Sequence, residues 1–208
     1  MATPAKELAQ AGYVAFTADY RADWPEFIDD AQLAVRWVRA NADTYGVDPE
    51  RICAYGWSAG GQLAAMLAVR DTRDDGDPAL GDYSSRVACA INLAGIADAA
   101  LPGPFATDDA WEAEHLGGTP QEAPEAYRDV SPVEFVDEQS GPMLVIQGSA
   151  DTTNPVEQSR RLVTALQEAG VEVIYAELAG ESHFSVSDWP LNGPYTLAFL
   201  ERHLHPDR

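Results

Sequence analysis

The clearest chemical signal in the sequence is the run Gly56-Trp57-Ser58-Ala59-Gly60-Gly61. A short apolar run at 51–55 precedes it and a run rich in Ala and Leu at 62–70 follows, which predicts a strand, a sharp turn and a helix. A serine on such a turn is held clear of the sheet, where its hydroxyl can act as a nucleophile. Gly56 and Gly60 are expected to be required, because side chains there would collide with the neighbouring strand and helix. The alternative is an accidental Gly-x-Ser-x-Gly in a turn, and the strand-before, helix-after context favours the nucleophile.

A nucleophilic serine needs a base to remove its proton and a carboxylate to orient that base. Asp151 follows an apolar strand predicted at 143–147, and His183 lies in the loop after the strand predicted at 171–175. Because such strand ends meet at one edge of an α/β sheet, the chain order Ser, Asp, His predicts a catalytic triad. The competing histidines lie in an irregular segment or near the terminus, and the competing acids do not follow a buried strand; they are His115, His203, His205, Glu181 and Asp188.

The elements that must position these residues alternate between strand and helix. This alternation predicts one α/β domain over residues 1–208, with a mainly parallel sheet covered by helices on both faces. Apolar runs predict strands at 13–19, 51–55, 87–93, 143–147 and 171–175. Helices are expected near 4–11 and over 25–44, 62–70, 155–169 and 193–204. The segment 95–131 has four prolines and no clear period, so it is expected to form an irregular, cap-like segment over the active site.

The charge of the chain is lopsided, with 34 acidic against 13 basic residues and a formal net charge of −21. Because nucleic-acid backbones and anionic membranes attract basic surfaces, neither is expected as a partner. No apolar run reaches the length of a membrane span, and the N-terminus lacks the apolar core of a secretory signal. The chain as it stands is expected in the cytoplasm, but a truncated N-terminus would have removed any signal and would point to secretion, so the compartment stays open. Cys53 and Cys89 fall in predicted buried strands without metal-ligand spacing; we expect free thiols and no metal site.

From about residue 5 to residue 200 the chain resembles the α/β-hydrolase superfamily. Within it, the sequence is most similar to the hormone-sensitive-lipase-like carboxylesterases and the acetylxylan/feruloyl esterases. The residues that carry the resemblance are Asp19-Tyr20-Arg21, 34–41, 45–52, 56–61, Asp129-Val130-Ser131-Pro132, 148–151 and His183. The resemblance implies that Ser58 is the nucleophile, His183 the general base and acid, and Asp151 the orienting carboxylate. It also implies ester hydrolysis through an acyl-enzyme, without cofactor or metal.

The chain departs from the family pattern on its N-terminal side. Family members usually carry three more strands upstream, and after the third a His-Gly-Gly loop whose amides form half of the oxyanion hole; this sequence has no His-Gly-Gly. The backbone N–H of Ala59 is expected to supply one donor, and losing the other typically costs about 2.7–4 kcal/mol in the transition state. Without the third strand, the strand at 13–19 must slide beside 51–55 or leave a gap filled by a partner chain. We therefore expect a reduced α/β-hydrolase fold of about five parallel strands in chain order, with a homodimer as the other way to cover apolar surface.

The leading hypothesis is a serine carboxylesterase for small esters, either short acyl esters or acetylated and feruloylated sugars. Aromatic residues are candidates for its acyl or sugar pocket, although each is also an ordinary core candidate; they are Trp57, Phe105, Trp111, Phe184 and Trp189. One alternative is a peptidase or thioesterase on the same triad. Another is a truncated, weakly active or inactive hydrolase-fold protein that binds a ligand or partner without turnover.

Overall fold

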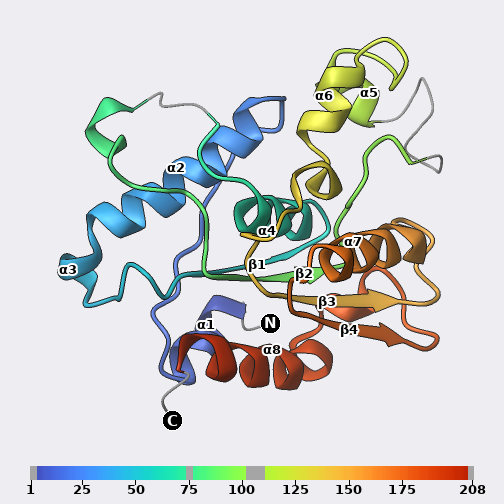
Figure 1. Cartoon of the computed structure of the whole chain (residues 1–208). Coiled ribbons are helices and arrows are strands. Elements are labelled where there is room, and N and C mark those ends of the chain that lie inside the picture. The colour runs from blue at the N-terminus through green and yellow to red at the C-terminus, as the bar shows by residue number, and fades with distance from the viewer. Residues whose placement is uncertain (1–3, 74–76, 102–110, 206–208) are drawn as a thin grey trace.

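Four parallel strands form the sheet of this computed structural model, which describes residues 4–73, 77–101 and 111–205 (Figure 1). The strands are β1 (Cys53–Trp57), β2 (Cys89–Leu93), β3 (Met143–Gly148) and β4 (Val173–Leu178). They lie in the order β1-β2-β3-β4, and every neighbouring pair is parallel. This arrangement confirms the predicted parallel sheet in chain order. β2 and β3 are apolar runs because both of their faces are buried.

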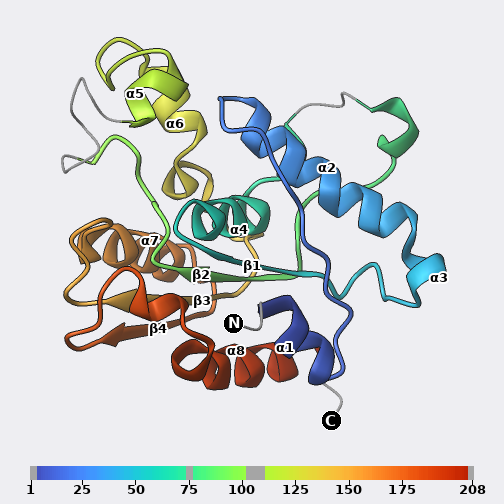
Figure 2. The same cartoon turned by 180° about the vertical axis from the view of Figure 1, so that it is seen from behind.

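Helices cover both faces of the sheet (Figures 1 and 2). One face carries α2 (Glu26–Ala40), α4 (Ala59–Val69) and α7 (Val156–Glu168); the other carries α1 (Pro4–Gln10) and α8 (Trp189–Leu204). The remaining helical pieces are short; they are α3 (Ala42–Tyr45), α5 (Trp111–Leu116), α6 (Pro124–Asp129) and the 3-10 turns Pro78–Leu80, Pro132–Phe135 and Ser185–Ser187. No helix in the described ranges is long and apolar enough to cross a membrane.

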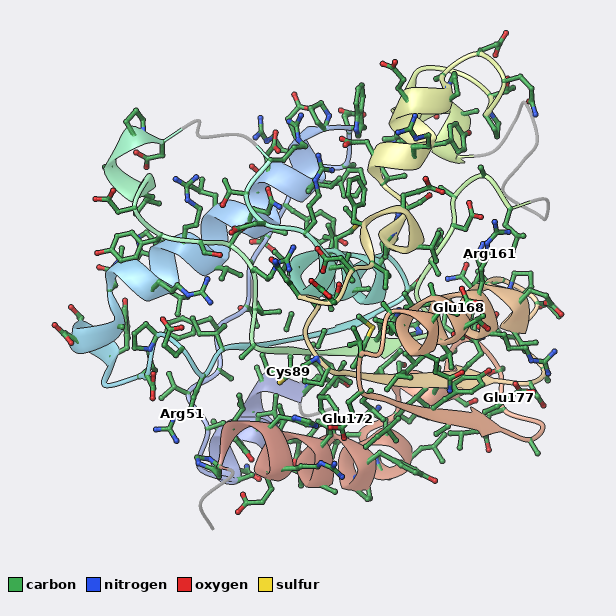
Figure 3. All side chains as sticks on the ribbon, viewed as in Figure 1. Arg51, Cys89, Arg161, Glu168, Glu172 and Glu177 are labelled. Atoms are coloured by element: carbon green, nitrogen blue, oxygen red, sulfur yellow. The ribbon has the colours of Figure 1, made fainter. Side chains whose placement is uncertain are left out.

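The core is divided by the sheet into two layers. Ala90 and Val145 face the layer of α2, α4 and α7, whereas Ile91 faces the layer that contains Phe199 and Leu200 of α8. Consecutive residues of a strand, such as Ala90 and Ile91, pack in opposite layers because side chains alternate between the two faces of a sheet. Figure 3 shows Arg51, just before β1, and Glu177, near the end of β4, at opposite ends of the sheet. Cys53 and Cys89 lie opposite one another on β1 and β2, and both are free thiols as expected.

The fifth strand, expected at 13–19, is not part of the sheet, and β1 is therefore an outer strand. Side chains hold this segment instead of ladder hydrogen bonds. The Tyr13 ring lies 5.6 Å from the His205 ring, and the Phe16 ring lies 5.1 Å from the Tyr45 ring. These contacts place the segment beside the ends of α8 and α3, and it does not pair with β1. The homodimer stays a prediction.

The irregular segment 95–131 contains α5 and α6, which lie beyond α4 on the side away from α8 (Figures 1 and 2). Two side-chain hydrogen bonds from other parts of the chain attach this segment to the rest of the fold. The Gln62 side chain donates to the Val130 carbonyl at 2.7 Å, and the Trp24 indole donates to the Asp129 carboxylate at 2.9 Å. Because residues 102–110 lie outside the described ranges, the cap over the active site stays a prediction.

Candidate active site

Ser58 lies at the junction of β1 and α4 with φ 56° and ψ −122°. A residue with a side chain adopts this conformation only where its surroundings hold it there. Two backbone hydrogen bonds do so: the Ser58 N–H donates to the Leu93 carbonyl at 2.9 Å, and the Ser58 carbonyl accepts from the Gln62 N–H at 3.0 Å. The strand, sharp turn and helix predicted around Ser58 are therefore present.

The glycines of this turn do not all serve the role expected of them. A Cβ on Gly56 would lie 2.0 Å from the Gly60 carbonyl oxygen, so Gly56 is required as predicted. The prediction for Gly60 is wrong, because a Cβ there would meet no atom within 4 Å apart from its chain neighbours and the backbone of its own helix. Gly61 is the second constrained position, with a Cβ placed 2.7 Å from the Asn92 Oδ1 atom. The close contact is therefore between the first turn of α4 and the end of β2.

The structure brings the three predicted triad residues together. The His183 Nε2 atom lies 3.0 Å from Ser58 Oγ, and the His183 Nδ1 atom lies 2.8 Å from Asp151 Oδ2. Asp151 follows β3 and His183 follows β4, so both reach Ser58 from the carboxyl ends of parallel strands. Asp151 and His183 are both buried. A carboxylate at Nδ1 favours the tautomer with its proton on that nitrogen, which leaves Nε2 free to accept the Ser58 proton.

The Asp151 carboxylate is held by a set of hydrogen bonds that the sequence did not reveal. Its Oδ1 atom accepts from the backbone N–H groups of Thr153 and Asn154, each at 2.8 Å. Its Oδ2 atom accepts from Gln147 Nε2 at 2.9 Å, and Gln147 Oε1 accepts in turn from the Ser159 hydroxyl at 2.8 Å. Gln147 is fully buried on β3. A glutamine inside an otherwise apolar strand, four residues before the aspartate, was the available signal.

Ala59, the expected oxyanion donor, is the first residue of α4 and is exposed. The first N–H groups of a helix have no partner within the helix, so this amide can donate to an anion that forms beside Ser58. The described residues also show whether a metal site is present. Within residues 4–73, 77–101 and 111–205, no three His, Cys, Asp or Glu side chains are grouped so that they could hold one.

Two of the predicted aromatic residues surround the base. The Trp57 ring lies 5.1 Å from the His183 ring and 5.5 Å from the Phe184 ring, and Phe184 is 66% exposed. Phe105 and the side chain of Trp111 lie outside the described part of the structure. Trp189 begins α8; it is half-buried, and its indole lies close to Gly193.

The competing titratable residues occupy other places. His115 lies 3.8 Å from Asp23, and the His205 ring lies against Tyr13. His203 packs against Phe199 on α8, and burial lowers its pKa. Of the competing acids, Glu181 offers its backbone carbonyl to the Ala150 N–H, and Asp188 precedes the first turn of α8; they support the site loops without replacing Asp151.

Comparison with known proteins places this geometry in a family. The family model BD-FAE matches residues 1–166, a stretch that includes Ser58 and Asp151. The chain belongs to the BD-FAE family. This BD-FAE chain is 34% identical over 214 residues to Esterase LipC of Mycobacterium tuberculosis, in a match that covers 97% of the chain and 53% of LipC. It thus spans about half the length of the curated relatives it matches.

Solved structures agree with the family assignment. The BD-FAE chain is 29% identical to the apo form of Thermogutta terrifontis esterase 2, with a TM-score of 0.77, covering 97% of this chain and 74% of that one. The same esterase, phosphoramylated by tabun, gives 28% identity and a TM-score of 0.75 over the same shares. A truncated carbohydrate esterase from gut microbiota gives 29% and 0.76, over 88% of this chain and 70% of that one. The expected reduced α/β-hydrolase fold and carboxylesterase group are confirmed.

Proposed function

We propose that this chain is a serine hydrolase that cleaves carboxylic esters through an acyl-enzyme on Ser58. The observation that carries the proposal is the line of two hydrogen bonds, 2.8 and 3.0 Å long, that joins Asp151 to His183 and His183 to Ser58. The esterase relatives and the esterase phosphoramylated by tabun support the same class of reaction.

Acylation follows from the positions of these three side chains. As Ser58 Oγ attacks the ester carbonyl carbon, its proton passes to His183 Nε2, and the carbonyl oxygen becomes an oxyanion. The Ala59 N–H is the proposed donor to that oxyanion. His183 then returns the proton to the leaving alkoxide, the carbon–oxygen bond of the ester breaks, and the alcohol departs.

Deacylation repeats the same steps with water in place of Ser58. His183 Nε2 takes a proton from the water while the hydroxide attacks the acyl carbon, and the same proton returns to Ser58 Oγ as the carboxylic acid leaves. The buried Asp151 carboxylate stabilises the imidazolium that forms in both halves. No cofactor takes part in this cycle.

The proposed substrates are small esters, with short acyl chains or with acetylated or feruloylated sugars. The likeness to a carbohydrate esterase supports the sugar esters. Trp57, Phe105, Trp111 and Phe184 are the proposed contacts for the acyl or sugar group. Phe184 is the best supported, because its ring is two-thirds exposed beside the His183 imidazole.

Hydrolysis of a p-nitrophenyl ester series from acetate to octanoate tests the proposal. Wild type should hydrolyse at least one ester far faster than Ser58→Ala does, whereas Ser84→Ala, a change in a distant loop, should match wild type. Equal rates for wild type and Ser58→Ala would defeat the proposal. Parallel assays on p-nitroanilides and acyl thioesters separate an esterase from a peptidase or thioesterase on the same triad.

One observation favours the second candidate, a weakly active or inactive form that binds a ligand. In the family pattern, the second oxyanion donor comes from a loop that follows another strand. In the described residues β1 is an outer strand, and no strand pairs with its free edge. Labelling with a fluorophosphonate decides between the candidates. Rapid labelling of Ser58 with slow ester turnover supports the weak form, and absence of labelling supports the inactive one.

A further inference from the structure

The residue before the nucleophile reaches the loop that carries the base. The Trp57 indole Nε1 donates a hydrogen bond to the His183 backbone carbonyl at 2.8 Å, and the two rings lie 5.1 Å apart at 42°. Trp57 is the last residue of β1 and is bonded covalently to Ser58. One side chain therefore ties the strand that presents the nucleophile to the segment that presents the base.

This tie matters because the base comes from a distant strand. β2 and β3 separate β4 from β1, and the chain after β4 must cross back over both to reach Ser58. Two bonds anchor this crossing segment to the Asp151 loop: the Ala150 N–H donates to the Glu181 carbonyl, and the Gly180 N–H donates to the Ser149 hydroxyl, both at 2.9 Å. Both anchors lie on the β3 side. The Trp57 indole adds an anchor on the β1 side.

We propose that Trp57 is a positioning residue that holds His183 Nε2 within hydrogen-bonding distance of Ser58 Oγ. The inference rests on the proposed esterase function. The indole N–H can only donate, so it selects a carbonyl acceptor and fixes the position of the His183 backbone. Its ring also packs against the imidazole and against Phe184, which restricts rotation of the His183 side chain. The bond orients the base without touching the reacting atoms.

Trp57→Phe separates the indole N–H from the aromatic ring that is proposed to contact the acyl or sugar group. Trp57→Phe keeps an aromatic ring and removes the N–H donor. With the loss of one hydrogen bond, kcat should fall about three- to tenfold while KM and the preference among acyl chain lengths stay unchanged. The matched control is Trp37→Phe on α2, where the ring packs against Phe16 and Tyr45. Its kcat and KM should equal those of wild type.

Tryptophan fluorescence tests the contact without any turnover. A protonated imidazole in ring contact quenches indole emission, so acidification should dim one of the five tryptophans as His183 takes up a proton. This titration should disappear in both Trp57→Phe and His183→Gln, and it should persist in Trp37→Phe. Because wild type and His183→Gln suffice for the comparison, the test survives even if Trp57→Phe fails to fold.

The outcomes separate this proposal from the esterase function itself. A fluorescence titration that depends on His183, with a lower kcat at constant KM in Trp57→Phe, supports the positioning role. An unchanged kcat, a change confined to KM or chain-length preference, or a titration unaffected by His183→Gln overturns it. Failure of wild type to hydrolyse any ester counts against the proposed function, whereas the fluorescence result still shows whether Trp57 contacts the base.

Discussion

The side-chain amide of Gln147 donates to Asp151 Oδ2 at 2.9 Å, and this is the oxygen that faces His183 Nδ1 at 2.8 Å. A carboxylate that accepts several hydrogen bonds has a defined orientation, and Asp151 accepts from two backbone amides on its other oxygen as well. Gln147 is held in turn by the Ser159 hydroxyl. The hydrogen bonds that orient the base therefore include two residues outside the triad, Gln147 on β3 and Ser159 on α7.

We expect Gln147→Met to lower kcat about three- to tenfold and the free energy of unfolding by about 1–3 kcal/mol, because Asp151 loses a donor and Ser159 a buried acceptor. Esterase kinetics and urea unfolding measure the two effects. Gln139→Met is the control, because Gln139 is exposed and only its backbone N–H is bonded. Wild-type kcat and stability in Gln147→Met would show that the amide does not support the carboxylate.

Removal of the Asp151 charge should leave the fold intact and disable the base. In Asp151→Asn the neutral amide no longer stabilises the imidazolium, and its NH2 group can donate to His183 Nδ1 and favour the wrong tautomer, so kcat should fall by about 10³–10⁴. The control Asp188→Asn changes an acid at the start of α8 and should keep most of the activity. A loss of less than tenfold in Asp151→Asn would show that another group orients His183.

Alanine substitutions at Gly56 and Gly60, two glycines of the same turn, should have opposite effects on stability. Gly56→Ala places a methyl group 2.0 Å from a carbonyl oxygen, and we expect it to lose the activity and about 1–3 kcal/mol or more of stability. Gly60→Ala adds a methyl group that meets no atom within 4 Å beyond its chain neighbours and its own helix backbone, and Gly60 lies inside α4. It should therefore keep the activity and gain about 0.5–1 kcal/mol, since alanine favours a helix over glycine. Thermal unfolding and ester assays compare the pair, and similar damage in both would contradict the geometry.

Asp71 should make stability depend on pH in the acid range. Burial raises the pKa of its carboxyl, but hydrogen bonds from Thr72, Ser84 and Ser85 outweigh it and lower the pKa to about 2. Because the folded pKa lies below the unfolded one, the stabilisation is present above about pH 4 and is lost as the pH falls towards 2. Allowing for solvent screening, it is worth about 1 kcal/mol.

Urea unfolding at pH 7 and at pH 2.5 tests this linkage. Asp71→Asn should be less stable than wild type at pH 7, and the difference should shrink at pH 2.5. The exposed Asp82→Asn serves as the control and should show no such difference. A gap between wild type and Asp71→Asn that is constant across this range would contradict the prediction.

Much of the site was readable in the sequence because its signals are local. The apolar run before Ser58 and the helix-forming run after it define the turn through neighbouring residues only. Asp151 and His183 were recognisable because each directly follows a strand of a parallel sheet, and such strand ends meet at one edge. Local pattern also predicted β2, β3, α1 and α7 with small differences in their bounds.

The sequence by itself determined the nucleophile turn, the order of the triad and the parallel sheet. Only the tertiary structure decided whether an extended run joins the sheet, which side chains support the base, and which glycines are constrained. Residues 13–19 look like a strand, yet they do not pair with the free edge of β1; the Tyr13 and Phe16 rings instead contact His205 and Tyr45. Gln147 and Trp57 act across contacts between different strands and loops, and such contacts exist only once the chain has folded. The position of Gln147 in an apolar strand hints at a role, but its partners are decided only by the fold.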